Sequence, residues 1–156
     1  MLEKKSLADV LAKVTHLPNR TPQSGFAGEA SAAFAVVSPY RDGSIYLGHY
    51  SGSSEWERHE SGDEIVLVLE GTTTVVLLSA GAEQNVQLGA GELVVVPKGV
   101  WHRFESSKSL KVMSVTPAPT GHALERPDAS YLHDAEPASM KNTGVDQAGR
   151  DDAGDA

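Results

Sequence analysis

The chain has 156 residues, which is the size of one ordinary domain. Its 13 basic and 21 acidic residues give a net charge of -8, and an acidic surface repels phosphate backbones, so nucleic acid is not an expected partner. The absence of cysteine excludes disulfides, thiolate metal ligands and a cysteine nucleophile. No apolar run approaches the ~20 residues of a membrane helix, and the N-terminus lacks the apolar segment of a secretory signal. We therefore expect a cytoplasmic domain that does not bind membranes.

Residues 1–31 are expected to form a short helix and an arm. Apolar residues recur at helical spacing over positions 7–14, and Ser6 with Asp9 three positions on resembles a capping box. Pro18 ends this pattern. Such a helix in front of a sheet is expected to pack on it or to cover its opening.

Residues 32–116 are expected to form an all-β domain. The region consists of short runs rich in Val, Leu, Thr and aromatic residues, each bounded by Gly, Pro, Ser or Asp. These runs cover residues 32–37, 44–50, 64–70, 72–79, 85–88, 93–96, 100–104 and 110–116. Many short strands at close spacing, with no helix between them, indicate an antiparallel sandwich or barrel.

Residues 117–156 are expected to form an acidic C-terminal tail. This segment holds 3 basic and 8 acidic residues, together with several prolines. From about residue 141 the apolar content is too low to offset the entropy of ordering, which predicts disorder.

Two segments carry side chains that could bind one metal ion. In an extended chain Glu57 and His59 point to the same face, and a turn at residues 61–63 brings Glu64 beside them. His102 follows a second turn and opens another strand. Two histidines with two carboxylates suit a divalent cation such as Fe, Zn, Mn or Ni. The spacing alone does not choose between a metal site and a set of core or solvated side chains.

The same segments resemble the paired motifs of the cupin superfamily, over residues 40–116. The first motif ends in Glu, six residues and Gly, which Glu64 and Gly71 fit, with His59 at the expected distance before that Glu. The second motif, which is Gly, five residues, Pro-x-Gly, two residues and His, is matched by Gly91, Pro97, Gly99 and His102. Three positions depart from the pattern: Glu57 stands in place of the first histidine of the family's histidine pair, Gly52 is one residue closer to that pair, and Ser106 stands where Asn is common.

The resemblance implies an RmlC-like jelly-roll barrel, also called a double-stranded β-helix, that holds one divalent metal ion. His59, Glu64 and His102 carry over as metal ligands. Glu57 occupies the position of the family's first histidine, so it is expected to be a fourth ligand or, if it turns away from the metal, a general base. Glu57 and Glu64 are therefore also the candidate catalytic residues. The resemblance further implies a homodimer.

Three aromatic residues are candidates for binding a substrate. Tyr46 and Tyr50 share one strand face, and their hydroxyl groups could donate hydrogen bonds to a ligand, with ordinary aromatic packing as the alternative. Phe104 shares the face of His102 and is expected to line the pocket. Trp101 should then point to the outside or to a subunit interface.

The remaining histidines are not expected to take part in the site. His49 alternates with its pocket-facing neighbour on one strand and should be structural or exposed. His122 and His133 lie in the predicted tail and should be solvated.

The resemblance implies a metal-dependent enzyme that acts on a small oxygenated metabolite as a dioxygenase, an isomerase or a lyase. The alternative is a non-catalytic cupin that binds or senses a small molecule such as a sugar or an organic acid. The enzyme is slightly favoured, because two carboxylates facing a pocket are costly unless a cation compensates them.

Overall fold

The computed structural model describes residues 2–128, and the all-β prediction is confirmed. The elements in chain order are α1 (Leu7–Leu11), β1 (Leu17–Arg20), α2 (Pro22–Phe26), the 3-10 helix η1 (Glu29–Ala33), β2 (Phe34–Tyr40), β3 (Gly43–Ser53), β4 (Trp56–His59), β5 (Glu64–Glu70), β6 (Thr72–Ser79), β7 (Ala82–Gly89), β8 (Leu93–Val96), β9 (His102–Pro117) and β10 (Thr120–Ala123). The predicted disorder from about residue 141 lies outside the described residues. No helix among residues 2–128 is long and apolar enough to span a bilayer.

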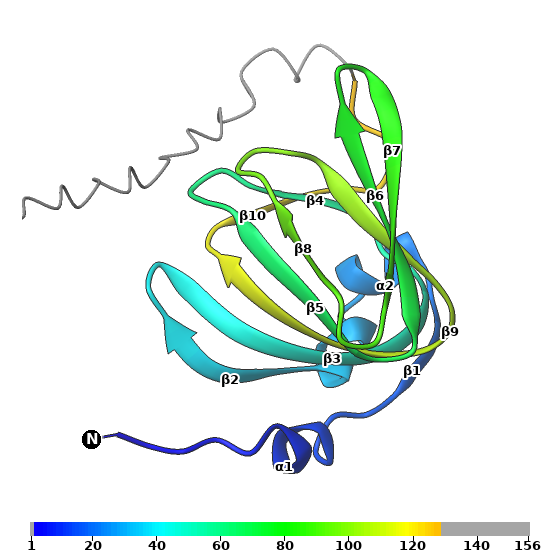
Figure 1. Cartoon of the computed structure of the whole chain (residues 1–156). Helices are drawn as coiled ribbons and strands as arrows, with labels where there is room; N and C mark the ends of the chain where they lie inside the picture. Colours follow the sequence, from blue (N-terminus) through cyan, green and yellow to red (C-terminus); the bar gives the residue numbers. More distant parts are fainter. Residues whose placement is uncertain (1, 129–156) are drawn as a thin grey trace, which may run out of the picture.

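The strands form a jelly-roll barrel in which β9 connects the two halves. At its start His102 pairs with Leu77 of β6 on one side and with Glu57 of β4 on the other. Further along, Val115 lies between Ile65 of β5 and Ile45 of β3. The two runs predicted at 100–104 and 110–116 are therefore one long strand. Figure 1 shows the strands curving around a common interior, with the β6–β7 hairpin extending at one end.

The core fills the barrel because alternate side chains of each strand face inward. In β5, Glu64, Val66 and Val68 are buried. Ile65, which lies between Glu64 and Val66, points outward. The buried core residues are Tyr50, Val66, Val68, Val75, Leu77, Leu88, Val96, Phe104, Leu110 and Val112. This register places Glu64, the first residue of β5, on the inner face.

A second, smaller cluster of buried side chains is separate from the barrel core. It contains Trp56, Val76, Leu78 and Trp101. The guanidinium of Arg58 lies over the Trp101 ring, and that of Arg103 lies over the Trp56 ring. Trp101 thus belongs to a cluster separate from the barrel interior, as its alternation with His102 predicts, but it is buried within the chain itself.

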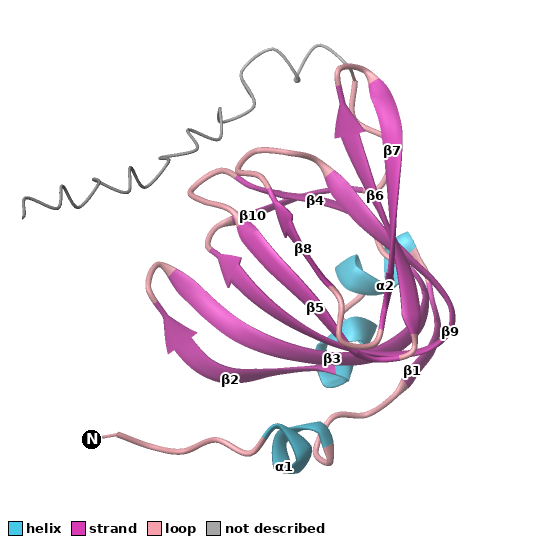
Figure 2. Ribbon diagram, in the orientation of Figure 1, coloured by secondary structure: helices cyan, strands magenta, loops and turns pink. Residues whose placement is uncertain are grey.

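The N-terminal arm differs in detail from the sequence prediction. The side chain of Ser6 accepts a hydrogen bond from the Asp9 N–H, as expected, but α1 ends at Leu11. Beyond it the Thr15 N–H bonds to the Ala32 carbonyl, which draws the chain away from the helix. The arm then adds β1 as a strand parallel to β3, and Figure 2 shows helical turns inside the curve of the strands.

Candidate metal centre

Four side chains from three strands converge inside the barrel. Glu57 and His59 come from β4, Glu64 opens β5, and His102 opens β9 directly opposite Glu57. One ligand atom from each of the four lies within 4.8 Å of the others. The structure therefore brings together the four residues that the sequence nominated as metal ligands.

The cluster is compact and almost sealed from solvent. Nε2 of His102 lies 2.9 Å from Oε2 of Glu64, and Nε2 of His59 lies 3.3 Å from the same oxygen. Oε1 of Glu57 is 3.4 Å from Nε2 of His102. His59, Glu64 and His102 are buried, while the Glu57 side chain is 17% exposed. Glu57 is thus the member of the cluster most open to the cavity.

Hydrogen bonds behind the cluster orient both imidazole rings. Nδ1 of His102 lies 2.9 Å from the Val100 carbonyl oxygen, which can only accept, so Nδ1 carries a hydrogen. Nδ1 of His59 lies 3.1 Å from Oγ1 of Thr120. Both rings therefore turn Nε2 towards the carboxylates. Among the described residues, Nε2 of His59 is a buried atom without a hydrogen-bond partner.

Two turns fix the backbone around the cluster. The Gly99 N–H donates to the His59 carbonyl at 2.8 Å, and the Lys98 N–H donates to Oδ1 of Asp63 at 2.8 Å. Gly99 has a φ of 77°, which glycine adopts without strain. The Pro-x-Gly turn therefore connects the loop before β5 to the loop before β9, and this explains why the motif spacing predicts the site.

The charges in the cluster are strongly coupled. Burial by itself lowers the pKa of His102, but hydrogen bonds and charges from Glu57 and Glu64 outweigh it and raise that pKa to about 10. Burial by itself raises the pKa of Glu64, but the hydrogen bond from His102 and the nearby imidazole of His59 outweigh it and lower that pKa to about 2. The carboxylates of Glu57 and Glu64 therefore favour a positive charge between the two histidines, which a proton or a metal cation can supply.

The donor set fits a divalent cation. Two imidazole nitrogens and two carboxylates are ligands that Fe, Zn, Mn and Ni accept. Metal-binding histidines commonly donate their second ring N–H to an oxygen, as His102 does to Val100. Thr116 donates to Oε1 of Glu64 at 2.6 Å, which leaves Oε2 facing the two histidines. The unpartnered Nε2 of His59 is the atom that a cation would satisfy.

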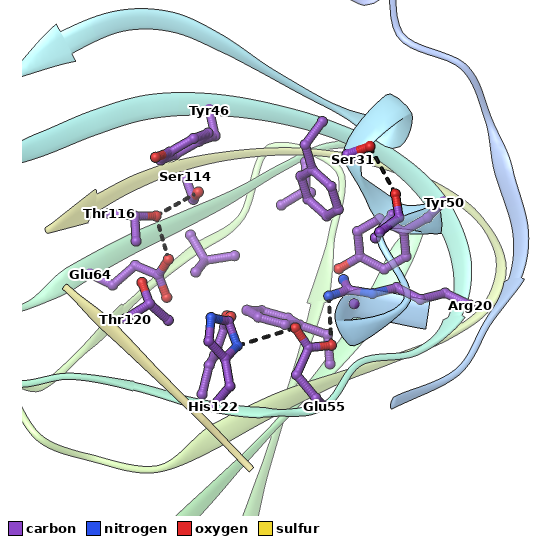
Figure 3. A pocket seen from close by; sticks show the side chains of 18 residues that line it. Arg20, Ser31, Tyr46, Tyr50, Glu55, Glu64, Ser114, Thr116, Thr120 and His122 are labelled. Carbon is purple, nitrogen blue, oxygen red and sulfur yellow. Dashed lines mark hydrogen bonds and ion pairs between the residues drawn. The ribbon is translucent and has the colours of Figure 1, made fainter. Parts of the chain in front are cut away.

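The cluster opens into a cavity of about 340 Å³. Figure 3 shows Glu64, Thr116 and Thr120 at one end of this cavity and Arg20 with Tyr50 at the other. The lining also includes Phe34, Tyr46, Val66, Phe104 and Val112. The volume and the mixture of apolar walls with a few polar groups are typical of a small-molecule site.

Comparison with known proteins agrees with this geometry. A family model described as "Cupin domain" matches residues 48–116, which hold all four residues of the cluster. A cupin-2 domain protein of Shewanella frigidimarina is 30% identical, with 60% of this chain and 92% of that chain covered and a TM-score of 0.49. The chain belongs to the cupin superfamily.

Two further relatives of this cupin differ in what they show. An acireductone dioxygenase of Rhodopseudomonas palustris (strain TIE-1) is 28% identical over 140 residues, which are 90% of this chain and 73% of the relative. The protein NMB1881 of Neisseria meningitidis is 20% identical, with 74% of this chain and 100% of that chain covered and a TM-score of 0.55. The second of these supports the fold alone.

The cupin cavity also contains the aromatic residues that the sequence nominated for substrate binding. Tyr46, Tyr50 and Phe104 all line it, and the Phe104 ring meets the His102 ring edge-on with centroids 5.7 Å apart. Burial raises the pKa of Tyr50, so its hydroxyl stays protonated. Their position is that predicted, and their contact with a ligand stays a prediction.

His122 lies on a strand rather than in the expected tail, although its side chain is 41% exposed, which agrees with the expected solvation. It lies on β10, which pairs with β4, and its side chain lines the cavity with Nδ1 3.4 Å from Oε1 of Glu55. Sequence reasoning also missed Arg20 and Glu55, which form a buried ion pair in the cavity wall. β1 and β10 are short strands without a clear apolar alternation, so the sequence carries little signal for either. His133 lies outside the described residues.

Metal affinity is expected to rise with pH between 6 and 9. The raised pKa of His102 means that the metal-free protein holds a proton there, which a metal ion must displace. The apparent affinity should therefore rise about tenfold per pH unit in this range. Competition with a chelator at several pH values measures this, with His49→Gln as a control because His49 lies outside the cluster. A flat profile would contradict the protonation of His102.

The same shifts predict the pH dependence of the metal-free protein's stability. Because the folded pKa of His102 lies above its ordinary value of 6.5, its contribution is present below pH 6.5 and is lost as the pH rises towards 10. Because the folded pKa of Glu64 lies below its ordinary value of 4.5, its contribution is lost as the pH falls from 4.5 towards 2. Stability should thus be greatest between pH 4.5 and 6.5.

Proposed function

We propose that this cupin is a metal-dependent enzyme acting on a small oxygenated molecule. His59, Glu64 and His102 would hold one divalent ion, with Fe, Zn, Mn and Ni as the candidates. The observation that carries this proposal is the buried, unpartnered Nε2 of His59, which points at the same carboxylate as Nε2 of His102. Such an atom is costly in a metal-free protein and useful as a ligand.

Glu57 has two possible roles in this proposal. Its carboxylate belongs to the cluster, so it can complete a set of two histidines and two carboxylates. It is also the most exposed member and lines the cavity, so it can take a proton from a bound substrate if it leaves the metal to the other three. Glu64, which accepts a hydrogen bond from Thr116 and lies beside both histidines, would serve as a ligand.

The proposed reaction type is an oxygenation. It is supported by the relative named acireductone dioxygenase, whose similarity extends over most of this chain. When bound, the metal supplies a Lewis acid and an open coordination position. The protein's own residues bind and orient the substrate: the phenolic groups of Tyr46 and Tyr50 offer hydrogen bonds, and the apolar wall at Phe104 limits water.

Oxygen uptake tests this reaction. With acireductone as the substrate, protein reconstituted with Fe(II), Mn, Ni or Zn should consume dissolved oxygen with at least one of these metals. His59→Ala should reduce the rate at least about 100-fold, because even the loss of an outer-shell partner of a metal ligand costs 10–100-fold. Uptake that is no faster in the metal-loaded wild type than in this variant would reject the oxygenase. Binding of small sugars and organic acids by the metal-free protein would then support the non-catalytic alternative.

We also propose that the chain forms a homodimer through the outer face of β5 and β8. Ile65, Leu93 and Val95 are 38%, 56% and 48% exposed there, and Ile65 and Val95 are cross-strand neighbours. Contiguous exposed apolar groups mark interaction surfaces. In sedimentation velocity the wild type should be a dimer and Ile65→Lys/Val95→Lys a monomer. Val36→Lys, at an exposed apolar position on β2, should leave the dimer intact, and a monomeric wild type would contradict the proposal.

A further inference from the structure

The cavity wall opposite the metal cluster contains a buried ion pair. Nη2 of Arg20 lies 3.0 Å from Oε2 of Glu55, and both side chains are only about one-twentieth exposed. Arg20 comes from β1, outside the segment matched by the cupin family model. Figure 3 shows Arg20 and Glu55 facing the cavity, away from Glu64.

Two glycines make room for this pair. A Cβ on Gly52 would overlap the backbone oxygen of Arg20, so the glycine lets β1 approach β3 closely. A Cβ on Gly25 in α2 would lie 2.7 Å from Oε1 of Glu55, so that glycine leaves space for the carboxylate. Burying two charges carries a desolvation penalty, so a role in holding the arm does not by itself account for the pair.

Arg20 keeps hydrogen-bonding capacity that the protein does not use. Its guanidinium stacks over the rings of Tyr50 and Phe34, at 4.7 and 5.2 Å from their centroids. A guanidinium has five N–H donors in a fork that matches a carboxylate. Nε of Arg20 is buried without a hydrogen-bond partner among residues 2–128.

The carboxylate of Glu55 does not fully satisfy this arginine. Only Oε2 of Glu55 bonds to Arg20, while Oε1 faces Nδ1 of His122 at 3.4 Å. Glu55 therefore holds the guanidinium in place from one side and is itself shared with a histidine. The ion pair lies near the metal cluster, because ligand atoms of Glu55 and Glu57 lie within 4.8 Å of each other and Glu57 belongs to the cluster, so one small molecule can contact both.

We propose that Arg20 binds the carboxylate of a small organic acid whose other end reaches the metal centre. This substrate class, an acid with a second oxygen-bearing group several atoms away, rests on the proposed function for its metal-bound end. Tyr50 supports the same end of the ligand, because its hydroxyl lies in the cavity wall beside Arg20 (Figure 3).

Calorimetric titration with a series of simple acids tests the proposal. The probes are the straight-chain dicarboxylates from malonate to adipate, each compared with the monocarboxylate of equal carbon number, on metal-loaded wild type. At one chain length the dicarboxylate should bind at least tenfold more tightly than its monocarboxylate. If the wild type prefers the dicarboxylate at no chain length, the proposal is overturned, and no variant is needed for this test.

A double variant assigns the preference to Arg20. Arg20→Gln/Glu55→Gln removes both charges together, so no unpaired charge is left buried. It should lose the dicarboxylate preference while metal content stays that of the wild type. The matched control is Arg126→Gln/Glu83→Gln, an ion pair outside the cavity, which should keep the preference. A folded Arg20 double variant that keeps it, with a lowered melting temperature only, would show that the pair merely fastens the arm.

Failure of the proposed metal centre can be distinguished from failure of the proposed role of Arg20. Metal content is measured on each sample before the titration. If the wild type takes up no metal, the monocarboxylates alone should still bind it, and binding should still be lost in the Arg20 double variant. Absence of that binding in metal-free wild type would overturn the role of Arg20 independently of the metal.

Discussion

His59→Ala/His102→Ala is expected to reduce metal affinity by more than about 100-fold, the largest effect of any change considered. Each substitution removes a whole ligand, and the loss of an outer-shell partner alone costs 10–100-fold. Both imidazoles direct Nε2 at Glu64, so no described side chain in the cluster replaces them. Competition with a chromogenic chelator measures the affinity, and circular dichroism checks that the barrel is folded.

The chain offers a matched control for this double variant. His16 and His49 are also a histidine pair, with ring centroids 4.5 Å apart, but they lie outside the metal cluster. His16→Ala/His49→Ala removes the same chemical groups and should keep wild-type affinity. If both double variants lose metal equally, the binding is not at the proposed site.

Gly52→Ala is expected to destabilise the fold by about 2–4 kcal/mol, which combines the strain of a left-handed conformation with overpacking. Gly52 has a φ of 102°, and the added Cβ would collide with backbone atoms of Arg20, which cannot move aside as a side chain can. The measurement is the free energy of unfolding from urea denaturation.

Gly91→Ala separates the two contributions to that loss. Gly91 has a φ of 82°, and a Cβ there meets nothing within 4 Å. It should therefore lose only about 1–2 kcal/mol from conformational strain. Equal losses in the two variants would mean that the close approach of β1 to β3 at Gly52 contributes nothing, and the position of Arg20 would then need another explanation.

The candidate site was predictable because its residues lie in local motifs. His102 follows a Pro-x-Gly turn, and that turn donates its Gly99 N–H to the carbonyl of His59. The spacing of the second motif is thus a direct consequence of how the two loops meet. The inward direction of Glu64 was implied by the resemblance to the cupin motif rather than by alternation, because residues 65–69 of β5 are all apolar and do not show which face is buried.

The far end of the cavity was not predictable for the opposite reason. Arg20 and Glu55 are 35 residues apart and meet only because β1 runs parallel to β3, and β1 is a short polar segment containing a proline. His122 reaches the cavity through the pairing of β10 with β4. Such contacts depend on long-range packing, and a charged residue in a short polar segment ordinarily indicates a solvated surface.

The substitution of Glu57 for the family's first histidine has a physical consequence at the centre. It makes the set two nitrogens and two carboxylates, so the protein's own charges neutralise a divalent ion when Glu57 ligates. A cluster of this charge is unfavourable when empty, and the raised pKa of His102 is the response of the metal-free protein. The charge of the cluster and the geometry of its donor atoms therefore both favour a bound cation at this site.

The most direct test is the metal content of tag-free wild type purified without added metal, measured by plasma mass spectrometry before and after incubation with divalent ions. We expect close to one equivalent of Fe, Zn, Mn or Ni per chain, and the identity of that metal would narrow the reaction. A wild type that is metal-free as purified and takes up none of these ions would contradict the metal centre, and with it the proposed enzyme.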